Sequence, residues 1–518
     1  MKSLRTVLSL LLVLLLAFAM VSCDGKTPEP KNLVTITFDG YSNLMDVPRT
    51  IYPITGEAGT TITNMPIPRY SGYQFAYWYT RDDNARQTPL GSKFPDNDVT
   101  VYPEWTKKVS GLGYETSTTA SGEKYIEITG YSATATTFII PSHIDGIPVT
   151  NIGDGLCKNN KNLTGNVEIP EGITTIGQDA FRGCSNLDGT LTLPTTLTTI
   201  EANAFKDCSK LSGDLTIPEG VTTIGTFAFS QCRGFDGTLT LPPTLTAIET
   251  SAFHGCDGLT GELILPSSLE TIGVSAFDSC SKLSGELNIP EGVTSIGDLA
   301  FYFCDGLTGT SSLPSTLVSI GNRAFELCRN LSGDLTIPNS VKTIGDQAFY
   351  ECKGLDGNLT IGSAVESIGE SAFRNCEKLT GDLTIPNSVK TIGKNAFNEC
   401  KGFTGKLTIG SAVESIGETA FVDCSGFISL TISEGVKSIG NYAFLGNSKI
   451  STAVIPASVS KIGTGTFSSC SRLQKIFCEV ESKPSGWNEY WNQGCSAKVY
   501  LKGTWSYIDG VPTPNAQN

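Results

Sequence analysis

The sequence is poor in the residues on which most catalytic and nucleic-acid-binding sites depend. It has only two histidines, His143 and His254, and its 51 acidic side chains outnumber its 37 basic ones. The scarcity of histidine argues against histidine-based catalysis and against a conventional zinc site. Because no run of lysine or arginine is present, nucleic acid is not an expected partner. We therefore expect neither a metal nor a cofactor.

The chain also lacks the short motifs that mark common enzymes. It contains no G-x-S-x-G, no phosphate-binding loop, no H-E-x-x-H and no convincing dinucleotide fingerprint. Asp and Glu are abundant, so a pair of catalytic carboxylates stays open at this point. A chain of near-identical repeats, however, offers few unique positions from which to build a unique pocket. We therefore expect no catalytic residues and no enzymatic activity.

One long apolar run lies near the start of the chain, over residues 7–20, and two basic residues precede it. This pattern predicts an export signal over residues 1–22. The run is short for a membrane-spanning helix, which needs about 20 apolar residues. Met20-Val-Ser-Cys23 resembles the lipobox of bacterial lipoproteins, in which a lipid is attached to the cysteine thiol. The resemblance implies that Cys23 carries a lipid anchor that holds the protein on a membrane.

Residues 33–106 are rich in aromatic side chains and contain no copy of the later repeat. VTITF (34–38) and VTVYPEW (99–105) alternate apolar and polar residues, as strands do. Together with TFDG and GYQFAYWYT, they resemble the Listeria–Bacteroides repeat of internalin-type surface proteins. This resemblance implies a small β-grasp-like module that serves as a spacer or interaction unit. Trp78 and Trp105 are expected in its core, because a small domain needs large apolar side chains.

Most of the remaining chain consists of one repeat. Ile-Gly or Ile-Glu occurs at fourteen positions from Ile152 to Ile462, first every 24 residues and finally every 23. Phe follows the Ile after five residues, and Cys follows the Phe after three. The full pattern is L-x-G-x-L-T-[IL]-P-x-x-[VL]-x-x-I-G-x-x-A-F-x-x-C-x-x. Each unit has too few apolar residues to form a core alone, so the units must stack on one another.

The repeat predicts three local structures. L-T-[IL] alternates like a short half-buried strand, and the Pro that follows it ends the strand. V-x-x-I makes a second inward turn. A-F-x-x-C places Phe and Cys on one face at the i, i+3 spacing of a helix. Fourteen units stacked about 4.8 Å apart would form a solenoid roughly 65 Å long.

The pattern, its period and both flanking segments resemble the BspA-like class of bacterial leucine-rich repeats. YIEITGYSATATTFIIPSHIDGIPVTNIG (125–153) is similar to the N-terminal cap of that class, and FCEVESKPSGWNEYWNQGC (477–495) to its C-terminal cap. The resemblance implies a leucine-rich repeat solenoid of short parallel strands joined by loops or short helical turns. The expected organisation is a signal peptide (1–22), the lipidated Cys23 with a linker (23–32), the β-grasp-like module (33–106), an N-terminal cap (107–150), the repeats (151–475), a C-terminal cap (476–505) and a polar tail (506–518).

The resemblance also implies a function. Members of the BspA-like class are implicated as bacterial surface adhesins that contact host matrix proteins such as fibronectin and fibrinogen. We therefore expect a lipid-anchored protein at the outer membrane or surface of a bacterial cell envelope, which binds a protein ligand through its extended repeat surface. A periplasmic structural scaffold and a glycan-binding accessory protein stay open as alternatives. The scarcity of tryptophan before Trp487 counts against glycan binding.

One repeat position is almost always cysteine. A single position per repeat gives a buried stack, and free cysteine is a good small buried hydrophobe. Disulfides between neighbours are not expected, because stacked identical positions do not point their Cβ atoms at each other. Cys478 and Cys495 lie outside this ladder in the C-terminal cap, where both a disulfide and two free thiols stay open. The ladder comprises Cys184, Cys208, Cys232, Cys256, Cys280, Cys304, Cys328, Cys352, Cys376, Cys400 and Cys424.

The polar position inside the L-T-[IL] strand is the candidate binding face. In a leucine-rich repeat this position faces the open sheet, where partners usually bind, although threonine also simply suits strands. Variation at 262–264 and 286–288 marks the place where a contact patch is expected. Lys342, Glu366 and Lys390 begin an alternating charge row at another position, either a docking strip or a ladder that sets register. The candidate face comprises Thr192, Thr216, Thr240, Ile264, Asn288, Thr336, Thr360, Thr384 and Thr408.

Overall fold

The structure is a computed structural model. It describes residues 32–39, 51–63, 65–68, 73–81, 87–109 and 111–515. The expected signal peptide and the lipid-attachment residue Cys23 lie outside these residues. In the described part of the chain, no helix has the length and apolar character needed to cross a bilayer. The chain divides into two compact units, one formed by the residues up to Lys108 with His143–Ile147, and one by Val109–Ser142 with Pro148 onward.

The first unit contains a five-stranded sheet. Strand β1 pairs in parallel with β5 and antiparallel with β2, and β3 pairs antiparallel with β5 and β4. Trp78 lies in the core of this unit and Trp105 packs against that core, which confirms the interpretation of both side chains as structural. The sheet order is β2 (Ile54–Glu57), β1 (Leu33–Phe38), β5 (Val99–Lys107), β3 (Tyr73–Arg81) and β4 (Gln87–Pro89).

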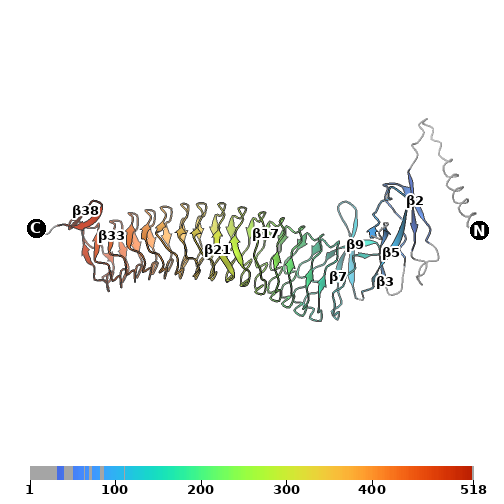
Figure 1. Ribbon diagram of the computed structural model, residues 1–518, viewed down its shortest axis with the longest axis horizontal. Helices are drawn as coiled ribbons and strands as arrows, with labels where there is room; N and C mark the ends of the chain where they lie inside the picture. Colours follow the sequence, from blue (N-terminus) through green and yellow to red (C-terminus); the bar gives the residue numbers. More distant parts are fainter. Residues whose placement is uncertain are drawn as a thin grey trace, which may run out of the picture. The chain divides into compact units, whose positions relative to one another are not determined.

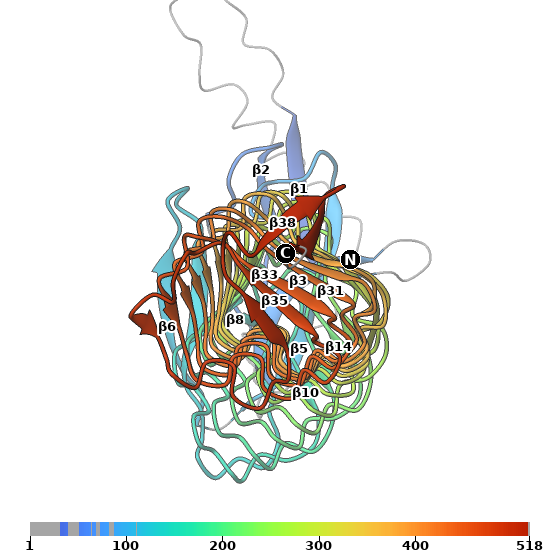
Figure 2. The same ribbon diagram turned by 90° about the vertical axis from the view of Figure 1, so that its left-hand side faces the viewer.

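The second unit is a stack of repeated turns, here called rungs, which confirms the predicted solenoid (Figure 1). Backbone hydrogen bonds join successive rungs along three walls. The first, the leucine wall, is made by the L-T-[IL] segments and is seen end-on with the others in Figure 2. Its strands are β10 (Val167–Glu168), β12 (Leu191–Thr192), β14 (Leu215–Thr216), β16 (Leu239–Thr240), β19 (Gly285–Asn288), β21 (Leu307–Ser312), β23 (Leu335–Thr336), β25 (Leu359–Thr360), β27 (Leu383–Ile385), β29 (Lys406–Ile409), β31 (Ser429–Ile432), β33 (Thr452–Ile455), β35 (Lys475–Cys478) and β37 (Lys498–Tyr500).

The second wall, the isoleucine wall, is a continuous parallel ladder of Ile residues. It extends one rung beyond the fourteen repeats at each end, because Ile128 of β7 pairs with Ile152 and Trp487 pairs with Ile462. Strand β6 (Gly113–Thr118) closes the first end by pairing antiparallel with β7 (Lys124–Gly130). The ladder strands are β9 (Ile147–Ile152), β11 (Thr175–Ile176), β13 (Thr199–Ile200), β15 (Thr223–Ile224), β17 (Ala247–Ile248), β18 (Thr271–Ile272), β20 (Ser295–Ile296), β22 (Ser319–Ile320), β24 (Thr343–Ile344), β26 (Ser367–Ile368), β28 (Thr391–Ile392), β30 (Ser415–Ile416), β32 (Ser438–Ile439), β34 (Lys461–Ile462) and β36 (Gly486–Trp487).

The third wall, the turn wall, is formed by the A-F-x-x-C segments, and here the prediction of short helical turns is wrong. The described residues of these segments contain no helix. Residues two before and two after each Phe adopt left-handed backbone angles, as at Asn203 (φ 57°) and Asp207 (φ 62°) around Phe205. This alternation of backbone angles prevents a helix and directs every second N–H toward the next rung. Thus Phe181 N–H donates to Ala204 O of the next rung at 2.7 Å, while Cys184 N–H donates to Phe181 O within its own rung at 3.1 Å.

The core of the solenoid is a stack of phenylalanine rings. From Phe181 to Phe467, successive centroids lie 5.0 to 5.7 Å apart with nearly parallel planes. The stack ends in T-shaped contacts, with Phe138 at one end and Trp491 at the other. Edge-to-face packing covers the exposed ring face of the last Phe, so each cap terminates the column with an aromatic side chain.

The end of the described chain differs from the polar tail that we expected. Residues Trp505–Ile508 (β38) and Val511–Pro514 (β39) form an antiparallel hairpin. Trp505 anchors it, because its ring is buried 5.0 Å from Phe477 and its Nε1–H donates to Cys478 O at 3.2 Å. A polar-looking segment is held here by one tryptophan.

Candidate binding surfaces of the repeat array

The cysteine position is a hydrogen-bond donor position. Each ladder thiol is buried, and Cys208 Sγ donates to Phe181 O at 3.1 Å, a contact that recurs at every cysteine from Cys184 to Cys424. Asn447 takes the position once and donates through Nδ2 to Phe421 O at 2.7 Å. Asn160 does the same toward Ser132 O at 3.3 Å. The shared property of the position is therefore a donor to the preceding rung.

Burial keeps these thiols protonated. It raises the pKa of Cys256 to about 12, against an ordinary value near 9, and the other ladder thiols shift in the same direction. A protonated, buried thiol is neither a nucleophile nor a metal ligand. In the described chain, no group of three or more His, Cys, Asp or Glu side chains is arranged to hold a metal ion.

Cys478 and Cys495 are free thiols in the structure, so the disulfide left open above is not formed. Cys495 follows Trp487 by eight residues, the same spacing that separates Ile462 from Cys470. Its thiol is only half-buried, however, and accepts a hydrogen bond from Ala497 N–H at 3.5 Å, unlike the donating thiols of the ladder. Cys478 instead ends strand β35 of the leucine wall.

The candidate binding face on the leucine wall is solvent-exposed. Its threonines point outward from Thr192 to Thr384, and Thr408 is half-buried. Ile264 interrupts the strip with a side chain that is 67% exposed, and Asn288 follows it in the next rung. An apolar side chain in a row of hydroxyls makes this part of the face chemically distinct.

The leucine wall is also irregular at the same place. Three pairs of its strands on either side of this place are joined by reciprocal clamps: in one of them Gly213 N–H donates to Asp236 Oδ1 at 2.8 Å, and Thr238 N–H donates to Asp214 Oδ1 at 2.7 Å. Equivalent clamps join the rungs of Gly165 and Gly333 to their successors. No equivalent clamp is described in the rungs of residues 259–330, where the pairing of β19 with β21 shifts between Glu286 and Asn288. The residues 262–264 and 286–288 thus lie where the sheet departs from its repeat.

The charge row lies at the position just before the isoleucine wall. Lys390 Nζ lies 2.7 Å from Glu366 Oε2, and Lys437 Nζ lies 3.2 Å from Glu414 Oε2. All four side chains are at least half exposed. Such exposed pairs contribute little to stability, which suits a register ladder on a solvated face.

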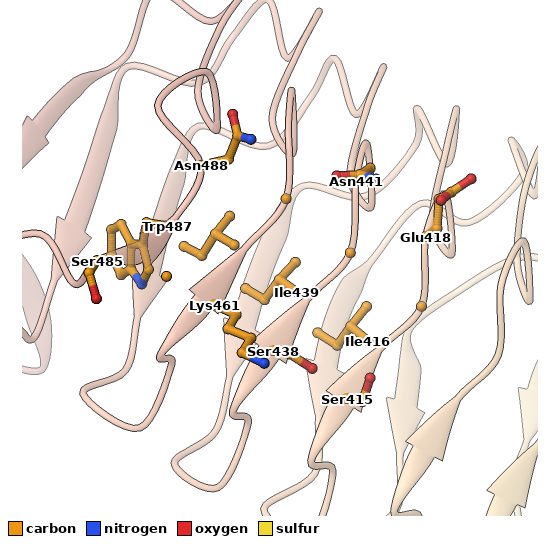
Figure 3. Close-up of a pocket in the computed structure, with 15 residues that line it drawn as sticks. Ser415, Ile416, Glu418, Ser438, Ile439, Asn441, Lys461, Ser485, Trp487 and Asn488 are labelled. Carbon is orange, nitrogen blue, oxygen red and sulfur yellow. The ribbon is translucent and has the colours of Figure 1, made fainter.

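Shallow grooves run along the isoleucine wall (Figure 3). One near the C-terminal end has a volume of about 490 Å³, with Ser415 and Ser438 on one side of Ile416 and Glu418 and Asn441 on the other. The groove exists because glycine follows each of the three Ile residues that line it, Ile416, Ile439 and Ile462. A Cβ at Gly440 would lie 2.5 Å from Glu418 N, so the rungs approach too closely for a side chain there.

The turn wall carries the most varied side chains, and our sequence reasoning overlooked it. Where the leucine wall repeats threonine, this wall changes at nearly every rung. Neighbouring rungs are matched in pairs: His254 Nδ1 lies 3.1 Å from Asp278 Oδ2, and the Arg374 guanidinium lies 5.8 Å from the Tyr350 ring centre. Comparing the rungs position by position would have identified this wall. The residue after the Phe is Ser230, His254, Asp278, Tyr302, Glu326, Tyr350, Arg374 and Asn398 in successive rungs.

A cavity of about 480 Å³ lies between the leucine wall and the β38–β39 hairpin. Glu434, Glu479 and Tyr507 line it. The two carboxyl groups influence each other's pKa, and Tyr507 Oη donates to Glu479 Oε1 at 3.3 Å. Burial, together with the hydrogen bond to Glu434, raises the pKa of Glu479. Burial alone would raise the pKa of Glu434 too, but hydrogen bonds from Ala457 N–H, Ser458 N–H and Glu479 lower it.

Comparison with known proteins identifies relatives of the repeat array. A family model described as a BspA type leucine rich repeat region matches residues 150–284, 211–332, 282–404 and 403–498. A leucine-rich repeat protein from Bacteroides ovatus ATCC 8483 is similar in structure, with a TM-score of 0.58, 25% identity, and coverage of 76% of this chain and 99% of that one. No curated protein matches the chain.

Two further solved structures share less of the geometry. A leucine rich cell surface protein from Faecalibacterium prausnitzii A2-165 is 26% identical with a TM-score of 0.37, over 74% of this chain and 96% of that one. The pneumococcal vaccine antigen PcpA is 18% identical with a TM-score of 0.44, over 76% of this chain and 98% of that one.

Proposed function

This chain belongs to the BspA-type leucine-rich repeat family, and from that premise we propose that it is a bacterial cell-surface protein whose repeat array binds a protein partner. The single observation that carries the proposal is that each rung has separate buried and solvent-facing positions. The Phe, Cys and Ile positions are buried, while neighbouring positions are left facing solvent along the whole array. A rigid series of outward-facing positions suits a large partner. The array acts as a binding scaffold and not as an enzyme.

We place the main contact in the rungs of residues 259–330. Ile264 offers exposed apolar area on the leucine wall. On the turn wall of the same rungs, the Arg329 guanidinium lies 5.7 Å from the Phe303 ring centre. Aromatic, apolar and arginine side chains dominate the binding energy of protein interfaces, whereas uniform threonine strips do not. The loss of the regular clamps leaves this region free to differ from the rest.

The chain supplies its own control for a deletion experiment. Residues 332–379 and 380–427 are near-identical, so deleting 332–379 shortens the array and leaves an ordinary Leu-Thr junction. Deleting 260–307 shortens it by the same length and also joins Leu to Thr. We expect the second deletion to abolish binding to host matrix proteins and the first to leave it largely intact. Equal loss from both deletions would indicate that length, not the middle rungs, determines binding.

Single substitutions then separate the two walls. Ile264→Thr gives the leucine wall the residue found in its neighbours, and Phe303→Ser gives the turn wall the residue found at Ser279. Each new side chain already occurs at an equivalent position, so the fold should persist. Loss of binding in only one variant assigns the contact to that wall. Full binding by both variants would contradict the placement of the contact.

The anchor and the location need separate tests. The lipobox-like Met20-Val-Ser-Cys23 supports a lipid on Cys23, and the small N-terminal module is proposed to be a Listeria–Bacteroides repeat that holds the array away from the membrane. Cys23→Ser should release the protein from membranes in the producing cell. Protease treatment of intact cells should remove the array while a periplasmic control survives. Protection of the array until the cells are permeabilised would refute the surface location and favour a periplasmic scaffold.

A further inference from the structure

The cavity beneath the β38–β39 hairpin is built differently from the grooves of the repeats. Its floor is the outward face of the leucine wall, where Ser429, Thr431 and Thr452 present hydroxyl groups. Its far side is the hairpin, fixed by the buried Trp505. The grooves described along the isoleucine wall have no such hairpin beside them. This end of the solenoid therefore combines an open sheet surface with a fixed side.

The β38–β39 hairpin contributes an aromatic ring to the cavity. Tyr507 is 54% exposed, and its ring packs edge-to-face on Trp505 at 5.1 Å between centroids. Its hydroxyl is directed to Glu479 Oε1. Both contacts hold the ring in one orientation, so its exposed part is a preformed apolar surface beside polar groups. Rigid aromatic surfaces of this kind bind apolar ring faces with little loss of side-chain entropy.

The polar groups of the cavity are balanced between donors and acceptors. Glu434 is fixed by N–H groups of Ala457 and Ser458 at 3.1 and 3.2 Å, and Glu479 accepts from Tyr507 Oη at 3.3 Å. The two carboxyl groups supply acceptors, while the hydroxyl groups of the floor both donate and accept. The nearby Lys502 ammonium offsets part of the remaining charge. A ligand that is neutral and rich in hydroxyl groups matches this set better than an ion does.

We propose that this cavity binds one sugar residue, with an apolar face of the pyranose ring against Tyr507 and its hydroxyl groups on Glu434, Glu479 and the threonines of the floor. The cavity volume of about 480 Å³ admits one such ring. The site is separate from the protein-binding rungs of residues 259–330, so it stands without the function proposed above.

The test is binding of neutral monosaccharides to the full chain, measured by saturation-transfer NMR and calorimetry, with putrescine as a cationic probe. We expect at least one hexose or N-acetylhexosamine to bind, and Tyr507→Ala to weaken it at least tenfold. Tyr507→Phe keeps the ring and should retain most of the binding. Tyr490→Ala is the matched control, because Tyr490 is similarly exposed at 51% but does not line the cavity. Near-ultraviolet circular dichroism establishes that each variant is folded.

Three results would overturn the proposal: no sugar binds, putrescine binds in place of sugars, or Tyr490→Ala weakens binding as much as Tyr507→Ala. A glycan array distinguishes the source of the sugar. Binding to free monosaccharide alone assigns the cavity to small nutrients or metabolites, whereas tighter binding to immobilised glycans assigns it to chain ends. Failure here leaves the deletion experiment on the middle rungs unaffected, so the two proposals fail independently.

Discussion

Asn447 offers the sharpest test of how the rungs are held together. It occupies the cysteine position, and its Nδ2 donates to Phe421 O at 2.7 Å and to Phe444 O at 2.9 Å. Its Oδ1 is buried without a hydrogen-bond partner in the described structure. The side chain thus supplies one needed donor and carries one unneeded acceptor. Asn447→Cys and Asn447→Ala both remove the acceptor, but only the cysteine keeps a donor.

The expected difference between these variants follows from the two groups. Leaving the buried Phe421 carbonyl without a donor costs about 1–3 kcal/mol. The smaller alanine also leaves a space of about one sulfur atom, which adds about 1 kcal/mol. We therefore expect Asn447→Ala to be about 2–4 kcal/mol less stable than Asn447→Cys. Asn447→Cys itself should equal or exceed the natural protein in stability, because the unpaired Oδ1 is gone.

The measurement must be local, because long repeat arrays do not unfold in one step. Hydrogen exchange of the Phe421 and Phe444 amides, which donate to Ala443 O and Thr466 O, reports the opening of these rungs. The Asn447→Ala variant should exchange there faster than Asn447→Cys by a factor of about 30 or more, with distant rungs such as that of Phe205 unchanged. Equal exchange in the two variants would show that the position is only a space to be filled and that the thiol donors are incidental.

Three further outcomes follow from the same structure. Gly321→Ala should destabilise the array by more than about 2 kcal/mol in thermal unfolding, since the new Cβ would lie 2.6 Å from Asp298 N. A change below about 0.5 kcal/mol would contradict the close approach of the two rungs at Gly321. Burial raises the pKa of Cys256 from about 9 to about 12, so the free energy of unfolding should be highest below pH 9. As the pH rises toward 12, it should fall by about 1.4 kcal/mol per pH unit for each such thiol, as measured by denaturant titration. Cys256→Ala should reduce that slope by the contribution of one thiol, and an unchanged slope would refute the raised pKa. Lys390→Gln should change stability in denaturant titrations very little, and any loss should shrink at high salt; a large, salt-independent loss would mean that the exposed charge row does more than set register.

The sequence predicted the parts of the fold that depend on period. The spacing of Ile, Phe and Cys predicted stacked rungs, because a position that recurs every 24 residues must lie above its own copy. It did not predict the backbone between those positions. The i, i+3 spacing of Phe and Cys suits a helix, yet left-handed residues such as Asn203 and Asp207 turn alternate N–H groups toward the next rung. Phe227 and Leu299 adopt the same angles, which no residue preference would indicate.

The candidate sites were predicted less well, and for a physical reason. The threonine strip was identified because it repeats, whereas specific binding depends on residues that do not repeat. Glu479 lies in the cap and Tyr507 lies in a hairpin that the sequence suggested was a tail. Only folding of the last strands over the leucine wall brings them to Glu434. The turn wall was overlooked because its varied residues match no motif.

The clamps link neighbouring rungs in pairs. Asp334 and Asp356 accept hydrogen bonds from N–H groups of each other's rung, so neither rung is complete without its partner. Segment 332–379 carries this complete pair, whereas segment 380–427 has Thr404 in place of the second carboxylate and keeps only the bond from Lys406 N–H to Asp382 Oδ1. The rungs of Gly261, Gly285 and Gly309 lie between two sets of clamped pairs. Because there are three of these rungs, they cannot all be joined in pairs. On the leucine wall these unclamped rungs carry Ile264 and Asn288 in place of threonine, and this is where we place the contact with a partner.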